Sequence, residues 1–175
     1  MSTNFTNKIL WTKEDLIKAS KGKDLTTKFL NDQKVIGISI DSRSIRQNDL
    51  FVAIKGQNYD GHDFLEKVLK KGASGVIVSC KYSALKYSGL FVKNTHIALI
   101  DIAKFSRNRF KGKIIGITGS NGKTTTKDMA KIIFSEFGKT FATPGNNNNI
   151  IGLSLSLMKL PYNFNYCILE LGMSK

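Results

Sequence analysis

The sequence predicts an α/β protein in which a small mixed α/β domain precedes the first part of a parallel-sheet domain that carries a phosphate loop. Short runs rich in Ile and Val alternate with segments of helical spacing, which is typical of parallel sheets covered by helices. A glycine-rich loop at residues 118–125 joins one such run to a helical segment. Hydrophobic residues make up 41% of the 175 residues, so a packed core is expected. The basic run at 107–113 marks an expected boundary between domains 1–111 and 112–175.

The elements of the amino-terminal domain are predicted from turn and helix signals around its apolar runs. The stretch from Thr12 to Asp15 has the pattern of a capping box and predicts a short helix through Ser20. Gly72 is the expected stop of a later helix. Loops are expected over 21–33 and 55–63, a linking helix over 95–110, and strands over 35–40, 50–54, 75–79 and 90–92.

The stretch 114–126 predicts a strand, a tight glycine loop and the first turn of a helix. Three β-branched isoleucines favour a buried strand in the centre of a parallel sheet, covered on both faces. The glycines let the backbone turn sharply and come close to a ligand. The apolar spacing after Lys123 predicts a helix up to Gly138, the expected C′ glycine.

This loop predicts a site for a nucleoside triphosphate, because a helix that opens on glycines presents free N–H groups and a positive dipole end to an anion. Lys123 adds a positive charge, and Thr124 a hydroxyl that can ligate Mg²⁺ beside a phosphate. The strict phosphate-loop pattern has glycine where this chain has Ile117, so an ordinary strand-to-helix connection is the alternative. The predicted site consists of Thr118, Gly119, Ser120, Asn121, Gly122, Lys123, Thr124 and Thr125.

Glu170 is a carboxylate inside an apolar strand predicted over 166–172. A buried unpaired charge is costly, so Glu170 should have a cation partner, and Mg²⁺ beside the phosphate loop is the candidate. The alternative is a surface glutamate at a strand terminus. A short strand over 139–142 and a helix over 153–160 are expected before it.

Four consecutive asparagines lie in the segment 143–152, here called the asparagine loop. Their amides can satisfy an oxygen-rich polar ligand, or they can form Asx turns on the surface. The residues alone do not separate these two interpretations.

The net charge of +14 comes mainly from lysines spread along the chain, with only four arginines. This distribution favours a solvated lysine surface, although the field can also attract anionic ligands. A nucleic-acid module would cluster its basic residues, so nucleic-acid binding is not expected.

Two isolated cysteines, Cys80 and Cys167, lie in β-like apolar runs and indicate structural thiols in a reducing compartment. No apolar run approaches the ~20 residues that span a bilayer, and the start lacks a signal-peptide pattern. We therefore expect a cytoplasmic protein without membrane insertion.

Several of these motifs together resemble the Mur ligase family. The motifs Asp41-Ser42-Arg43, Asp49 to Gly56 and Asp60 to Phe64 resemble its amino-terminal nucleotide-sugar domain, and Thr118 to Thr125 resembles its phosphate loop. The asparagine loop, with Glu170-Leu171-Gly172, is most similar to the F-type ligases of the family.

The resemblance implies an ATP-dependent peptide ligase of peptidoglycan synthesis that uses Mg²⁺. It would join D-alanyl-D-alanine to UDP-N-acetylmuramoyl-tripeptide through an acyl phosphate. By the same resemblance Lys123 and Glu170 are catalytic, and Thr124 and Glu170 bind the metal. Ser42 and Arg43 lie near the uridine diphosphate, and His62 stabilises a turn that supports that site. The substrate path is lined by Asn146, Asn148 and Asn149.

The sequence also departs from the family pattern. Ser154 stands where family members usually carry proline, which removes a helix starter and leaves the chemistry untouched. The pattern would also continue beyond Lys175. We therefore expect a truncated ligase that is inactive alone, or half of a split ligase complemented by a carboxy-terminal fragment. The alternative is a non-catalytic nucleotide-binding remnant.

Overall fold

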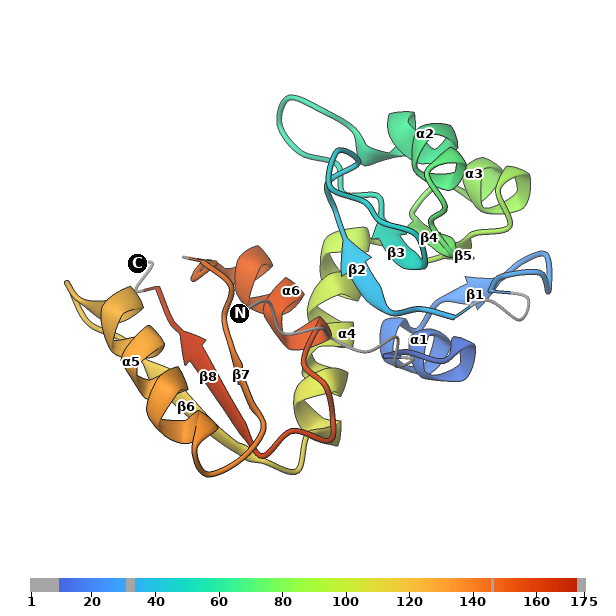
Figure 1. The fold of residues 1–175 in the computed structure, drawn as a ribbon. Coiled ribbons are helices and arrows are strands. Elements are labelled where there is room, and N and C mark those ends of the chain that lie inside the picture. The colour runs from blue at the N-terminus through green and yellow to red at the C-terminus, as the bar shows by residue number, and fades with distance from the viewer. Residues whose placement is uncertain (1–9, 31–33, 146, 173–175) are drawn as a thin grey trace. The chain divides into compact units, whose positions relative to one another are not determined.

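The computed structural model describes residues 10–30, 34–145 and 147–172, and its chain divides into two compact units, Met1–Asp101 and Ile102–Lys175. The division falls inside helix α4 (Thr95–Arg109), which is the linking helix expected over 95–110 (Figure 1). The sequence placed the domain boundary slightly later, at about residue 111. The predicted α/β class with parallel sheets is confirmed.

The first unit contains a five-stranded sheet in the order β1-β5-β4-β3-β2. Its central strands pair in parallel, and only the short β1 is antiparallel to its neighbour β5 within the described residues. A buried apolar cluster packs on this sheet and includes Phe51, Val76 and Val78 from its strands. The strands are β1 (Lys23–Asp24), β2 (Gly37–Ser39), β3 (Asp49–Val52), β4 (Gly75–Val78) and β5 (Leu90–Phe91). The helical elements before α4 are α1 (Lys13–Ser20), η1 (Gly61–Phe64), α2 (Leu65–Lys70) and α3 (Lys81–Lys86).

Local signals placed several of these elements correctly. The Thr12 side chain caps α1 by accepting a hydrogen bond from the amide of Asp15 at 3.2 Å. Gly72 follows α2 with a φ of 91°, as expected of a helix-ending glycine. One expectation was wrong, because β1 lies in the stretch assigned to a loop, and helix α3 was missed. Helix α3 buries only Ser83 and Ala84, so no apolar spacing marks it in the sequence.

The second unit contains a fully parallel sheet in the order β6-β8-β7, formed by β6 (Lys113–Ile117), β7 (Thr140–Ala142) and β8 (Tyr166–Glu170). Parallel pairing of β6 is confirmed, but its expected central, buried position is wrong. In the described residues β6 lies at the sheet edge, and its isoleucines are half-buried. Strand β8 is central because it pairs with both β6 and β7. This pairing joins segments far apart in sequence, so the composition of β6 does not predict it.

Alternation along β8 divides its side chains between two helices, α5 (Lys123–Ser135) and α6 (Ile150–Met158), which lie on opposite sides of this sheet (Figure 1). Cys167 and Leu169 join an apolar cluster with Phe110 and Phe141, against which the α6 side chains pack. Glu170 instead contacts the first turn of α5. Helix α6 begins earlier than the expected residue 153, because Asn149 caps it by accepting from the amide of Gly152.

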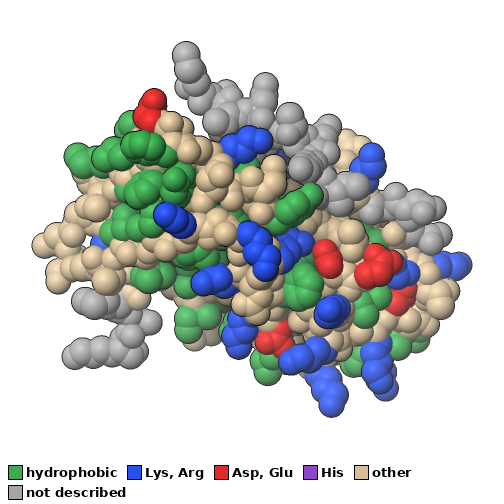
Figure 2. All heavy atoms as spheres, turned by 90° about the horizontal axis from the view of Figure 1, so that it is seen from below, with side chains coloured by type: hydrophobic (Ala, Val, Ile, Leu, Met, Phe, Trp, Pro, Cys, Tyr) green, Lys and Arg blue, Asp and Glu red, His purple; other side chains and the backbone are tan. Residues whose placement is uncertain are grey.

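The outward side of α5 carries the exposed apolar side chains Met129, Ile132 and Ile133, and the exposed Phe137 follows the end of the helix. Figure 2 shows hydrophobic side chains gathered at the left of the view, the side on which Figure 1 draws α5. The expected C′ role of Gly138 is wrong, since its φ is not positive and the helix ends at Ser135. A Cβ on Gly138 would lie 2.8 Å from the side chain of Asn165, so close approach requires this glycine.

The two cysteines differ more than their sequence surroundings suggested. Cys167 is buried in β8, as expected, whereas Cys80 is exposed and follows the end of β4. None of the helices in residues 10–30, 34–145 and 147–172 is long and apolar enough to span a membrane.

Candidate nucleotide-binding site

The glycine loop turns through two backbone conformations that side chains disfavour. Gly119 has a φ of 146° and Gly122 a φ of 74°. Helix α5 starts at Lys123, no side chain caps it, and its first turn holds no acidic residue. The first amides of an α-helix have no partner within the helix, so this end presents N–H donors to an anion.

Lys123 folds back over its own loop. Its ammonium group donates to the carbonyl oxygens of Gly119 at 2.7 Å and Ser120 at 3.4 Å. The surrounding residues Thr118, Ser120, Asn121, Gly122, Thr124 and Thr125 are exposed. The loop is therefore open to solvent, with a cationic side chain held beside its donors.

Glu170 lies next to this loop because β8 pairs with β6 in parallel, with Ile117 opposite Glu170. The alternative of a surface glutamate is wrong, since Glu170 is only 1% exposed. One carboxylate oxygen, Oε2, accepts from the Thr124 hydroxyl at 2.9 Å, and the other, Oε1, accepts from the amide of Asn148 at 3.0 Å.

The cation partner that Glu170 requires is present in the chain itself. Lys127, only 2% exposed, places its Nζ atom 3.6 Å from Oε2 of Glu170. Burial alone would raise the pKa of Glu170, but hydrogen bonds from Thr124 and Asn148 and the charge of Lys127 hold that pKa below its ordinary value. The sequence analysis missed Lys127 among many lysines. Its position three residues after Thr124, on the same helix side, was the available signal.

Two asparagine side chains of the asparagine loop make hydrogen bonds within the chain. Asn148 bonds to Glu170, and its backbone carbonyl accepts from the amide of Gly172 at 2.9 Å. Asn149 caps α6 through its side-chain oxygen at 2.7 Å from the amide of Gly152. Asn146 lies outside the described residues. Asn149 thus makes the local Asx-type contact that one interpretation expected.

A magnesium ion fits the donor set at this position. Mg²⁺ in phosphate sites takes one or two carboxylates together with phosphate oxygens and water, and here one carboxylate and one hydroxyl are adjacent. Among residues that the structure describes, no three His, Cys, Asp or Glu side chains gather into a metal-binding group. An ion held by Glu170 and Thr124 would therefore depend on the phosphates for further ligands.

The predicted uridine-site residues lie in the first unit, on the turn that follows β2. Arg43 grips the carboxylate of Asp41 with two nitrogens, at 3.0 Å and 2.9 Å. This pairing holds the pKa of Asp41 below its ordinary value. Ser42 is buried, and its carbonyl oxygen accepts from the Lys71 ammonium at 3.0 Å. Lys71 therefore fixes this turn from the end of α2, a role that its sequence position did not reveal.

His62 bridges two segments of the same unit. Its Nδ1 lies 2.6 Å from a carboxylate oxygen of Asp60, and its Nε2 accepts from the amide of Ser79 at 3.0 Å. Both ring nitrogens are thus engaged, which suits the turn-stabilising role expected of His62.

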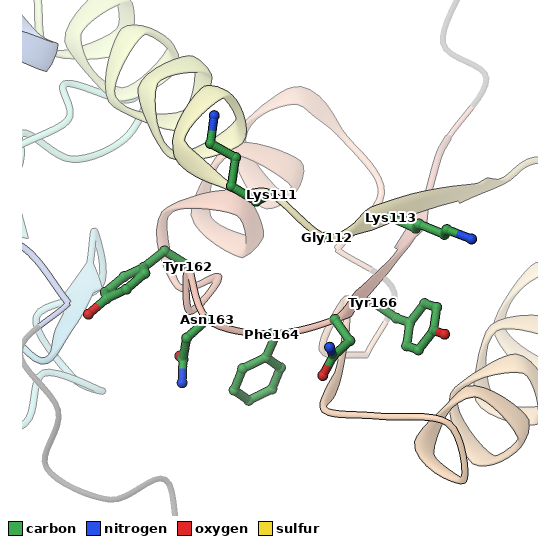
Figure 3. A pocket seen from close by; sticks show the side chains of 8 residues that line it. Lys111, Gly112, Lys113, Tyr162, Asn163, Phe164 and Tyr166 are labelled. Carbon is green, nitrogen blue, oxygen red and sulfur yellow. The ribbon is translucent and has the colours of Figure 1, made fainter.

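A separate hollow of about 450 Å³ lies at the amino ends of β6 and β8, whereas the glycine loop follows the carboxyl end of β6 (Figure 3). It therefore holds none of the predicted site residues. Its walls are formed by Lys111, Gly112, Lys113, Tyr162, Asn163, Phe164, Asn165 and Tyr166.

The strand, glycine turn and uncapped helix define an α/β protein of the phosphate-loop class. The Mur ligase middle domain matches residues 117–175, and the Mur ligase family catalytic domain matches residues 34–107. This chain belongs to the Mur ligase family.

Relatives and solved structures of the F-type ligase support this membership. The UDP-N-acetylmuramoyl-tripeptide–D-alanyl-D-alanine ligase of Bacillus subtilis (strain 168) is 38% identical over 146 residues, covering 82% of this chain and 32% of the relative. The ligase of the same name from Escherichia coli (strain K12) is 35% identical, covering 77% and 30%.

Among solved structures, MurF from Acinetobacter baumannii superposes with a TM-score of 0.80 and 33% identity, covering 93% of this chain and 35% of that one. MurF from Thermotoga maritima, solved in complex with ADP, gives 0.64 and 32% identity, covering 79% and 32%. The chain spans about a third of the length of these proteins.

Proposed function

We propose that this chain supplies the uridine-nucleotide-binding and ATP-binding parts of a ligase that joins D-alanyl-D-alanine to UDP-N-acetylmuramoyl-tripeptide. The names of its relatives support the reaction, and the contact between Thr124 and Glu170 beside the glycine loop carries the assignment to this chain. The proposed boundary between the two parts lies near residue 111. A cytoplasmic location, suggested by the two isolated thiols, belongs to the same proposal.

In the proposed reaction an oxygen of the tripeptide carboxylate attacks the γ-phosphorus of ATP, and ADP leaves with the bridging oxygen. The amine of D-alanyl-D-alanine then attacks the acyl carbon and loses a proton, while phosphate departs with the carbon–oxygen bonding pair. The amides at the start of α5 and the Lys123 ammonium are suited to offset the phosphate charge. Mg²⁺, for which Glu170 and Thr124 are the proposed ligands, would neutralise further charge when bound.

The remaining site residues have proposed roles in substrate binding. Ser42 and Arg43 are proposed near the uridine diphosphate, where the guanidinium can pair with phosphate oxygens. The asparagines at 146, 148 and 149 are proposed along the path of the muramoyl substrate. The contacts of Asn148 with Glu170 would link that path to the ATP site.

Isothermal titration tests this function, with Mg-ATP and UDP-N-acetylmuramoyl-tripeptide added separately to the chain. The proposal expects both to bind, and binding of neither would overturn it. Uridine-nucleotide binding without any ATP binding would favour the second candidate, a non-catalytic nucleotide-binding remnant. Phosphate release on adding a polypeptide with the remaining two thirds of a relative's sequence would support one half of a split ligase.

A further inference from the structure

Lys127 is a buried charged residue of the second unit to which the proposed chemistry gives no role. Its side chain is 3% exposed, although a lysine ammonium loses strong hydration on burial. Nζ donates to the carbonyl oxygen of Gly145 at 2.6 Å and lies 3.6 Å from Oε2 of Glu170. It also lies 3.6 Å from a carboxylate oxygen of the exposed Asp128. An apolar side chain of similar length would fill the same volume but could not make these contacts. We therefore infer that the contacts of the ammonium group are the reason for a lysine at this position.

Lys127 and its partners Glu170 and Gly145 belong to three separate segments. Lys127 lies on α5, Glu170 ends β8, and Gly145 lies in the asparagine loop, which follows β7. Asn148 then ties the same loop to β8 twice, through its side chain to Glu170 and through its carbonyl to the amide of Gly172. Lys127 therefore stands where the phosphate-loop helix, the acidic strand end and the asparagine loop meet.

We propose that Lys127 is a positioning residue that clamps the asparagine loop and Glu170 to the phosphate-loop helix. The clamp sets the carboxylate of Glu170 beside Thr124 before any ligand arrives. It also fixes Asn148 relative to the same carboxylate. The expected effect of Lys127 on Mg-ATP binding rests on the proposed function. The contacts that form the clamp do not depend on that function.

Amide hydrogen exchange tests the clamp without any ligand. Lys127→Met removes the charge while keeping most of the volume, and Lys131→Met is the matched control, because Lys131 lies one turn further along α5 and is exposed. We expect the amides of Gly152 and Gly172 to exchange about tenfold faster in Lys127→Met, with strand amides of the first unit unchanged. Lys131→Met should match the wild type. Equal protection of these two glycines in wild type and Lys127→Met would overturn the proposal.

A second variant keeps the test decisive if Lys127→Met fails to fold. Lys127→Met combined with Glu170→Gln leaves no buried unpaired charge, so this double variant should fold. The carbonyl of Gly145 still lacks its donor, and the Gly152 and Gly172 amides should again exchange faster. Wild-type protection in the double variant would also overturn the clamp.

A binding measurement separates positioning from general structural support. In wild type, Mg²⁺ should strengthen ATP binding. In Lys127→Met this Mg²⁺-dependent gain should fall about tenfold, while the affinity for metal-free ADP stays within about twofold. Equal losses with and without Mg²⁺ would mark Lys127 as merely structural. If the wild-type chain binds no nucleotide at all, the proposed function fails, and the exchange experiment still decides the clamp.

Discussion

Thr124 donates its hydroxyl hydrogen to the carboxylate of Glu170 across 2.9 Å, which joins two motifs that stand 46 residues apart in the chain. Thr124 lies in the first turn of α5, and Glu170 ends β8, the central strand of the sheet in the second unit. The carboxyl ends of parallel strands meet at one edge, where α/β proteins commonly place their ligands. A hydroxyl, a carboxylate and a helix N-terminus thus share that edge.

Replacing Lys123 by alanine should weaken ATP binding about 10- to 100-fold, because a charge-assisted contact to phosphate is lost. The affinity for a uridine nucleotide should not change, since Lys123 lies in the second unit and the proposed uridine-site residues lie in the first. Titration calorimetry of both ligands measures the two effects. Lys131→Ala on the same helix is the control, and equal loss of both affinities in Lys123→Ala would contradict the two-site picture.

Replacing Gly122 by alanine should destabilise the fold by roughly 1–2 kcal/mol, because alanine pays for a left-handed backbone that glycine adopts freely. No atom lies within 4 Å of an added Cβ, so strain in φ is the sole expected cause. Gly122→Asn should lose less folding stability than Gly122→Ala, since asparagine tolerates positive φ better than other side chains. Urea unfolding compares the three proteins, and equal midpoints for Ala and Asn would contradict this ranking.

The two cysteines should differ sharply in reactivity with an alkylating reagent. Burial raises the pKa of Cys167 to about 12, despite the opposing charge of Arg107. The pKa of the exposed Cys80 is lowered by hydrogen bonds from Ser83. Iodoacetamide at pH 8 should therefore label Cys80 first and Cys167 only on unfolding, because the thiolate is the nucleophile. Peptide mass spectrometry reads both sites, and simultaneous labelling in the native protein would count against the buried strand.

Protonation of Asp24 should lower the folding stability of the protein in acid. Burial raises its pKa, but the hydrogen bond from Lys13, at 2.7 Å, and those from the amides of Thr26 and Phe29 together hold that pKa below its ordinary value. A lowered folded-state pKa gives stability that is present above the unfolded-state pKa, near 4, and lost as pH falls through the folded value.

Asp24→Asn should therefore cost roughly 1–2 kcal/mol at pH 6 and progressively less below pH 4, because the charged hydrogen bonds are already absent in the variant. Urea midpoints across this range measure the difference. The exposed Asp63 supplies the control, as Asp63→Asn should follow the wild-type curve. A constant gap between Asp24→Asn and wild type at every pH would exclude this linkage.

Features encoded by a few neighbouring residues were predictable from sequence. The loop between Gly119 and Gly122, the start of α5 at Lys123 and the cap at Thr12 all follow from local backbone chemistry. The need for a cation beside Glu170 also followed, from the cost of a buried charge.

Features set by long-range packing were not predictable in the same way. The edge position of β6 results from the pairing of β8 between β6 and β7. Gly138 is needed because the backbone there lies close to the side chain of Asn165, which is distant in sequence. In the sequence Lys127 cannot be distinguished from a surface lysine, because its contact with the asparagine loop exists only in the fold. Its identity as the partner of Glu170 required the fold.

The pairing of Ile117 with Glu170 makes the register of β8 a condition of the proposed site. Because side chains alternate along β8, a slip of one position would turn a leucine toward α5 and send the acid to the opposite face. A single-residue insertion between Tyr166 and Leu169 would thus separate Glu170 from Thr124 while the Glu170-Leu171-Gly172 motif stayed intact.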